Sequence, residues 1–161
     1  MANCPVRLSD ESVETIVRES GGYPYFIQFI CREVYDVFIQ QLSNQESASV
    51  PVEPIQRKLD TDFFAGRWAR VTDRQRQMLW VVANLEHGDE EEFTIQELVA
   101  QSKALLPKAF SPSHASQMLV TLAEHGLVYK NRFGKYAFAV PRLEEFIRRT
   151  YEPPNELDLA T

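Results

Sequence analysis

Hydrophobic residues recur at helical spacing over most of the chain, and the first stripe follows Ser9, a residue type that favours the N-cap position. This stripe ends at Gly21 and Gly22, which lack side chains and readily turn a chain. Pro24 then suits the first turn of a second helix, whose apolar residues cover much of its circumference. The pattern therefore predicts a helical first region, completed by a third stripe at Ile55, Leu59 and Phe63.

A second helical region begins after a change of character near residue 69. Two pairs three residues apart have the composition of capping boxes, and a Ser-Pro pair has the order of an N-cap followed by a first-turn proline. Each of them predicts the start of a helix. The predicted starts are Thr72 with Gln75, Thr94 with Glu97, and Ser111 with Pro112.

Two β-prone runs, 127–130 and 135–140, follow these helices and are separated by a turn that contains Gly134. Three helices and a hairpin are typical of a winged helix, a helix-turn-helix with a β-hairpin wing. A closing helix is predicted after Pro141. We therefore expect a mainly α fold, with a helical bundle over 1–69, a winged-helix domain over 70–151 and an acidic flexible tail over 152–161.

The charge of the chain is unevenly distributed. The net charge is −6, which argues against a general nucleic-acid binder, and residues 1–65 carry five basic and ten acidic side chains. Residues 66–150 carry twelve basic and ten acidic side chains, so only this block favours DNA. No run of residues has the length and apolarity of a bilayer span, and no signal peptide is evident. We expect a cytoplasmic protein without membrane contact.

Motifs for catalysis are scarce. The sequence has no GxxxxGK[ST], GxSxG or HExxH motif and no paired CxxC. The acidic run from Asp89 to Glu92 is interpreted as a solvated loop rather than a metal site. We therefore expect no catalytic residue and no metal site, and this chain alone is not expected to hydrolyse ATP.

The segment from Glu19 to Gln28 carries the most specific signal, because a helix ends there, two glycines turn the chain and Pro24 opens an aromatic helix. A simple helix–helix turn is the alternative interpretation. The Gly-Gly-Tyr-Pro sequence resembles the lid of AAA+ and STAND ATPases, especially prokaryotic and origin-recognition-like members. In these relatives the corner faces the base of the nucleotide. The resemblance implies that Gly22, Tyr23 and Pro24 line an adenine pocket.

The resemblance extends into the second region, because such ATPases commonly place a winged helix directly after the lid. It implies that this chain is a non-catalytic C-terminal region of a P-loop ATPase. Its lid-like bundle would contribute to a nucleotide pocket, and an upstream ATPase domain would supply the phosphate-binding half. ATP or ADP would then bind the longer protein rather than this fragment alone.

In DNA-binding winged helices, the third helix enters the major groove and the wing contacts the backbone or minor groove. The outward positions of the predicted third helix offer hydrogen-bonding side chains but no Arg or Lys, whereas the wing is basic around Phe133. A solvated hairpin is the alternative for the wing. The candidate DNA-binding residues are Ser113, His114, Gln117, Thr121, Lys130, Arg132 and Lys135.

Two other functions remain open. The chain could be a stand-alone winged-helix transcription regulator that dimerises through Tyr25, Phe29 and Tyr35. Alternatively, the winged helix could serve only for contact with a protein partner, as the acidic total and the Arg-free third helix favour.

Overall fold

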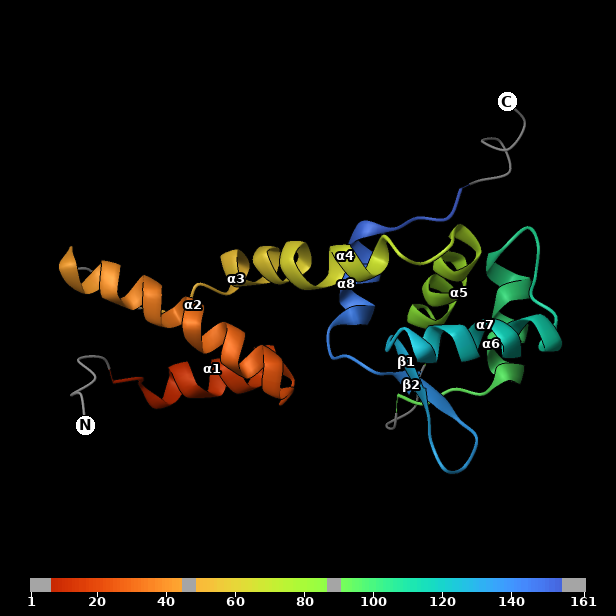
Figure 1. The fold of residues 1–161 in the computed structure, drawn as a ribbon, viewed down its shortest axis with the longest axis horizontal. Helices are drawn as coiled ribbons and strands as arrows, with labels where there is room; N and C mark the ends of the chain where they lie inside the picture. The colour runs from red at the N-terminus through yellow and green to blue at the C-terminus, as the bar shows by residue number, and fades with distance from the viewer. Residues whose placement is uncertain (1–6, 45–48, 87–90, 155–161) are drawn as a thin grey trace. The chain divides into compact units, whose positions relative to one another are not determined.

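The computed structural model describes residues 7–44, 49–86 and 91–154. Asp89, Glu90 and most of the predicted acidic tail, residues 155–161, lie outside the described residues. The chain divides into two compact units, 1–63 and 64–161, which are described separately below (Figure 1). The predicted fold class is confirmed, because helices dominate and the second unit contains a two-stranded antiparallel hairpin followed by a helix.

The first unit is built from α1 (Asp10–Ser20), α2 (Pro24–Ser43) and α3 (Val52–Leu59). The Ser9 hydroxyl accepts the Ser12 N–H and caps α1 as expected, and α2 lies against α1 (Figure 1). The three predicted apolar stripes supply the core of this unit. Its buried hydrophobic side chains are Ile16, Phe26, Ile30, Val34, Phe38, Ile55, Leu59 and Phe63.

The division between the units falls within η1 (Asp60–Phe64), a π-helical turn that precedes the short α4 (Ala65–Trp68). Phe63 packs edge-on against Phe26 of the first unit, with ring centroids 4.9 Å apart. Phe64 stacks on Phe146 of the second unit at 5.0 Å. Sequence analysis predicts a boundary near residue 69, and the two units of the structure divide between Phe63 and Phe64.

The second unit has the winged-helix order of elements. Both predicted capping boxes are formed, and Ser111 caps α7 through the N–H of His114. The three helices pack against one another around buried side chains such as Met78, Leu98 and Leu119. The elements are α5 (Asp73–Ala83), α6 (Ile95–Leu105), α7 (Pro112–Glu124), β1 (Val128–Lys130), β2 (Tyr136–Phe138) and α8 (Leu143–Thr150).

The hairpin pairs β1 with β2 in the register Val128↔Phe138. A third segment, at Phe93, also pairs with β2, and sequence analysis did not predict this pairing. Phe93 and Tyr136 exchange both backbone hydrogen bonds at 2.8 Å, and the Phe93 side chain is 1% exposed. The acidic run from Asp89 to Glu92 is predicted to be a solvated loop, and Phe93 follows it directly. Phe93 adds a buried edge to the sheet, where its ring stacks on Tyr136.

The closing helix α8 is fastened to α5. The Arg148 guanidinium donates from both Nε, at 2.7 Å, and Nη2 to the backbone carbonyl of Ala83, close to the C-terminal end of α5. Glu144 pairs with Arg148 at 2.7 Å and orients it. Arg148 therefore satisfies a carbonyl oxygen near the end of a helix, where a cation also complements the helix dipole.

Candidate functional site

The predicted adenine corner is a backbone feature of the first unit. Gly21 and Gly22 both adopt left-handed conformations, with φ of 57° and 72°, and both are exposed. A Cβ atom built on Gly22 would meet no heavy atom within 4 Å. The backbone of Gly22 is thus accessible to a close-approaching group, and other residue types would be strained at its φ angle.

A buried serine that the sequence analysis did not single out holds this corner. Ser20 is 0% exposed, its hydroxyl donates to the carbonyl of Val17 at 3.0 Å, and it accepts the N–H of Gly22 at 3.3 Å. The N–H of Tyr23 donates to the carbonyl of Ser20 at 3.1 Å. The turn is therefore fixed by polar contacts within one short segment, and a serine just before two glycines was the available signal.

Tyr23 and Pro24 have different surroundings at the start of α2. The Tyr23 ring is half-buried and packs edge-on against Phe26, with centroids 5.1 Å apart, whereas Pro24 is exposed. Pro24 occupies the first turn, as predicted, and the Tyr23 N-cap makes no side-chain capping hydrogen bond. The corner therefore exposes the backbone of the two glycines, the ring of Pro24 and part of Tyr23.

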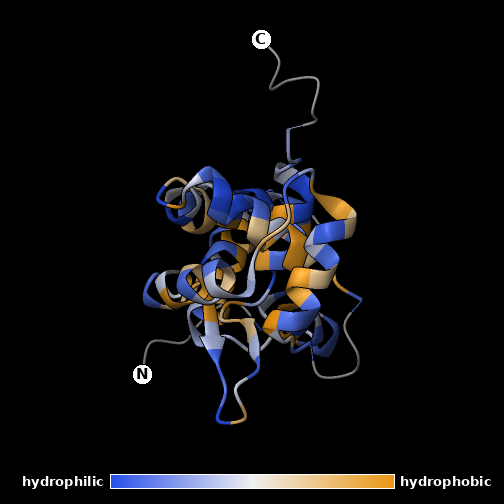
Figure 2. Cartoon of the chain, turned by 90° about the vertical axis from the view of Figure 1, so that its right-hand side faces the viewer, coloured by the Kyte–Doolittle hydropathy of each residue, from blue (hydrophilic) through white to orange (hydrophobic). Residues whose placement is uncertain are grey.

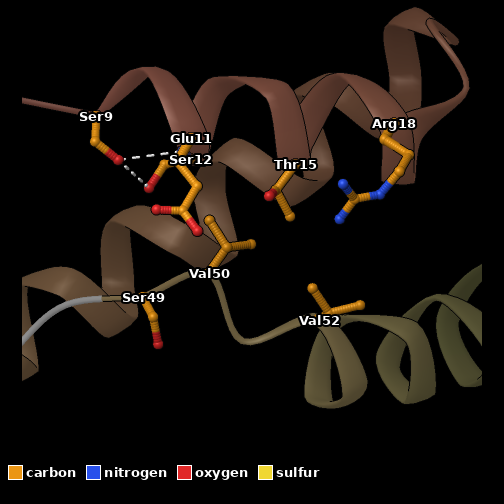
Figure 3. Close-up of a pocket in the computed structure, with 8 residues that line it drawn as sticks. All are labelled: Ser9, Glu11, Ser12, Thr15, Arg18, Ser49, Val50 and Val52. Atoms are coloured by element: carbon orange, nitrogen blue, oxygen red, sulfur yellow. Dashed lines mark hydrogen bonds between the residues drawn. The ribbon is translucent and has the colours of Figure 1, made fainter.

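A separate open pocket of about 220 Å³ lies between α1 and the segment that leads into α3 (Figure 3). Gly22, Tyr23 and Pro24 do not line it. Arg18 is the one basic side chain in its lining, and it pairs with the adjacent Glu19 at 3.2 Å. Half of the lining residues carry a hydroxyl group, and the full set is Ser9, Glu11, Ser12, Thr15, Arg18, Ser49, Val50 and Val52.

Helix α7 places three of its four predicted contact residues at the surface. Ser113, His114 and Gln117 are exposed, whereas Thr121 is half-buried and its hydroxyl donates to the carbonyl of Gln117 at 3.4 Å. Val120, between them, is 54% exposed. The outward face of α7 carries no Arg or Lys over these positions, and it offers hydrogen-bonding groups and apolar contact.

The turn that leads into α7 is held by Arg74 of α5. The Arg74 guanidinium donates to the carbonyls of Lys108 and Ala109, at 2.7 and 3.2 Å, and lies 3.9 Å from the ring centroid of Phe110. Burial lowers the pKa of Arg74, although an arginine remains charged throughout the physiological range. The buried hydroxyl of Ser102 accepts the N–H of Phe110 at 3.0 Å.

Replacement of Arg74 by Met should loosen this turn, because it removes charge-assisted hydrogen bonds and a cation–π contact while it retains most of the apolar stem. We expect the free energy of unfolding to fall by about 1–2 kcal/mol in urea titrations followed by tryptophan fluorescence. Lys103→Met, at an exposed position of α6, is the control and should change it by less than about 0.5 kcal/mol. Equal effects would show that the Arg74 contacts do not stabilise the turn.

The wing, the turn between β1 and β2, is held by hydrogen bonds to Asn131. The Asn131 side-chain oxygen accepts the N–H groups of Phe133 and Lys135, at 2.9 and 3.0 Å, and its amide donates to Glu92 at 2.7 Å. Gly134 has φ of 81°, and its N–H donates to the carbonyl of Asn131. Sequence analysis did not identify Asn131, although Asn is a preferred residue for such side-chain-capped turns.

The three predicted wing cations are exposed and lie close to aromatic or acidic groups. The ammonium of Lys130 lies 5.5 Å from the Tyr136 ring, and the guanidinium of Arg132 lies 4.7 Å from the Phe133 ring. Lys135 pairs with Glu92 at 3.6 Å. Phe133 is 74% exposed, so the wing presents an aromatic ring among cations (Figure 2 shows the projecting hairpin).

Aromatic packing continues at the far end of α8. The ring of Tyr151 packs edge-on against Trp68, with centroids 5.5 Å apart. Burial and, to a smaller extent, the Asp73 carboxylate raise the pKa of Tyr151, and Arg76 opposes them. The phenol is therefore protonated at neutral pH, and it contributes apolar packing rather than charge.

None of the described helices is long and apolar enough to cross a bilayer. No curated protein and no solved structure matches this chain. One family model does match, over residues 61–147, which include α4 to α7, the hairpin and most of α8. Because this match covers more than half of the chain, the protein belongs to the family described as a domain of unknown function (DUF8462).

Proposed function

We propose that this chain is the non-catalytic C-terminal region of a P-loop ATPase, in which the first unit acts as a lid over the nucleotide and the second contacts DNA. The exposed Gly21-Gly22 corner is the observation that carries the proposal. The open space above Gly22 leaves room for a flat base to approach the backbone closely, as this proposal requires.

In this proposal, Gly22, Tyr23 and Pro24 line the adenine side of a pocket, and an upstream ATPase domain supplies the phosphate-binding half. The apolar surface of the first unit supports a covering partner of this kind. Val13 and Val17 of α1 are 44% and 55% exposed, and Tyr25, directly after the corner, is 48% exposed. In the proposed protein, the upstream domain would cover these apolar side chains.

The second unit would bind duplex DNA in the way that its fold favours, with α7 in the major groove and the wing on the backbone. Ser113, His114 and Gln117 would contact base edges or phosphates, and Thr121 would contribute through its methyl group. Lys130, Arg132 and Lys135 would neutralise phosphates. A region that responds to ATP and contacts DNA would work in the cytoplasm, where both are present.

Contact with a protein partner is the second candidate for the winged helix. It is favoured by one observation, the exposure of Val120 on an α7 face that lacks Arg and Lys. A stand-alone regulator would use the exposed aromatic residues of α2 for dimerisation. It is favoured less, because Tyr25 lies directly beside the corner and Tyr35 lies farther along the helix. Salt-insensitive association, or no binding of DNA, would favour the protein partner.

Gly22→Ala should weaken nucleotide binding when this chain is expressed together with the ATPase domain that precedes it. The added methyl group would occupy the space proposed for the base, and the strain of about 1–2 kcal/mol at positive φ would shift the corner. We expect a fall in ATP affinity of roughly 5-fold to 100-fold in isothermal titration calorimetry.

Gly126→Ala is the matched control, because Gly126 has φ of 70° and equal open space but lies in the second unit. It should cost similar stability and leave ATP affinity unchanged. Equal losses of ATP affinity in both variants would refute the corner as a nucleotide contact. Tight ATP binding by the 161 residues alone, or the absence of a phosphate-binding loop from the upstream reading frame, would refute the ATPase assignment.

A further inference from the structure

The tip of the wing exposes an aromatic ring where a solvated turn would normally carry polar side chains. Phe133 is 74% exposed, more than any other large hydrophobic residue that the structure describes as exposed. The hairpin projects away from the helices of its unit and is largely hydrophilic (Figure 2). The ring adds nothing to the core of its unit and is accessible to a partner outside the chain.

The ring is presented on a fixed support. The N–H of Phe133 is held by the Asn131 side chain, and Asn131 is itself tied to Glu92 at 2.7 Å. Glu92 also pairs with Lys135 on the other side of the turn. The tip is therefore braced from a segment 39 residues earlier, which lowers the entropy lost when the ring binds a partner.

The surroundings of the ring indicate the chemistry of the partner. The Arg132 guanidinium lies 4.7 Å from the Phe133 centroid, and Lys130 is exposed at the base of the same turn. The carboxylate of Glu92 pairs with Lys135 on the other side of the turn. An aromatic face among cations matches a nucleobase flanked by phosphates, because stacking and charge neutralisation then act together.

We propose that Phe133 stacks on a nucleobase when the wing contacts nucleic acid, and that Asn131 positions the ring for this contact. The inference rests on the proposed DNA contact of the second unit and deepens it. The base is provided either by a partly opened step of a double helix or by an unpaired nucleotide, and the ring makes the same stacking contact with both.

The test measures binding of the 161-residue chain to three labelled probes by fluorescence anisotropy: a duplex, the same duplex with one unpaired base, and a single strand. Phe133→Leu retains an apolar side chain but removes the stacking face. We expect it to lose roughly 5-fold to 100-fold in affinity on the preferred probe, since stacking contributes about 1–3 kcal/mol per base. Phe133→Trp should retain the wild-type affinity.

Two further variants separate stacking from charge and from general hydrophobicity. Lys130→Ala should lower the slope of log affinity against log salt by about 0.9, and Phe133→Leu should leave that slope unchanged. Tyr129→Leu changes an aromatic residue that is 47% exposed on β1, away from the tip, and it should bind within about 2-fold of the wild type. Asn131→Ala should weaken binding in the same direction as Phe133→Leu.

Each outcome has a distinct meaning. Preference for the probe with the unpaired base identifies that base as the source, whereas equal binding to the intact duplex identifies an opened step. Wild-type affinity of Phe133→Leu, or an equal loss in Tyr129→Leu, overturns the stacking role while the DNA contact stands. Failure of the wild-type chain to bind any probe at low salt overturns both proposals.

Discussion

Phe93→Ala should destabilise the second unit by about 3–5 kcal/mol, the cost of removing a fully enclosed phenylalanine ring. Phe93 is 1% exposed and stacks on Tyr136, with ring centroids 6.0 Å apart. Its backbone hydrogen bonds to Tyr136 remain possible in the variant, so the loss measures side-chain packing. Thermal unfolding followed by tryptophan fluorescence reports on this unit, because Trp68 and Trp80 both belong to it.

We expect the melting temperature to fall by at least about 12 °C, since each kcal/mol corresponds to about 4–8 °C in a domain of this size. Phe133→Ala is the matched control, because it deletes the same side chain from the exposed wing tip. It should change the free energy of unfolding by no more than about 0.5 kcal/mol. A similar fall in both variants would mean that Phe93 does not form a buried edge of the sheet.

Phe26→Ala should have a comparable effect on the first unit. Phe26 is 0% exposed and contacts the aromatic rings of Tyr23, Tyr25 and Phe63, with centroids 5.1, 6.1 and 4.9 Å away. Its removal leaves a cavity directly beneath the corner and should cost about 3–5 kcal/mol. Hydrogen exchange of the α1 and α2 amides, measured by mass spectrometry, should accelerate throughout the unit.

The control for Phe26 is Leu42→Ala, which removes a side chain that is 52% exposed near the end of the same helix. Exchange in α1 and in the first half of α2 should then remain at the wild-type rate. Acceleration confined to the residues next to Phe26 would contradict a shared core for α1 and α2.

In the proposed ATPase, Phe26→Ala should also weaken ATP binding, because the Tyr23 ring loses its packing contact with Phe26.

The elements that the sequence predicted well are those specified by neighbouring residues. Ser9, the two capping boxes and Ser111 each act within three residues, so their side chains define helix starts without help from the rest of the fold. The hairpin likewise follows from β-prone runs around Gly134. In contrast, the pairing of Phe93 with Tyr136 joins segments 43 residues apart, as their numbering shows, and no local pattern specifies it.

For the candidate residues of α7, the sequence predicted exposure to solvent, because exposure follows from helical periodicity. Ser113, His114 and Gln117 face outward because they lie opposite buried Ala115, Leu119 and Leu122. The residues that support them, Arg74 and Asn131, act through partners 34 and 39 positions away. Such partners become apparent only when the chain is folded, and for this reason the sequence predicts α7 and the wing but not the residues that support them.

The contact between Arg148 and Ala83 has a practical consequence for anyone who trims this protein to its family-matched span. That span ends at residue 147, one position before Arg148. A trimmed polypeptide would lose both donors to the Ala83 carbonyl and the final turn of α8. Preparations of the isolated winged helix should therefore extend at least to Tyr151, whose ring also covers Trp68.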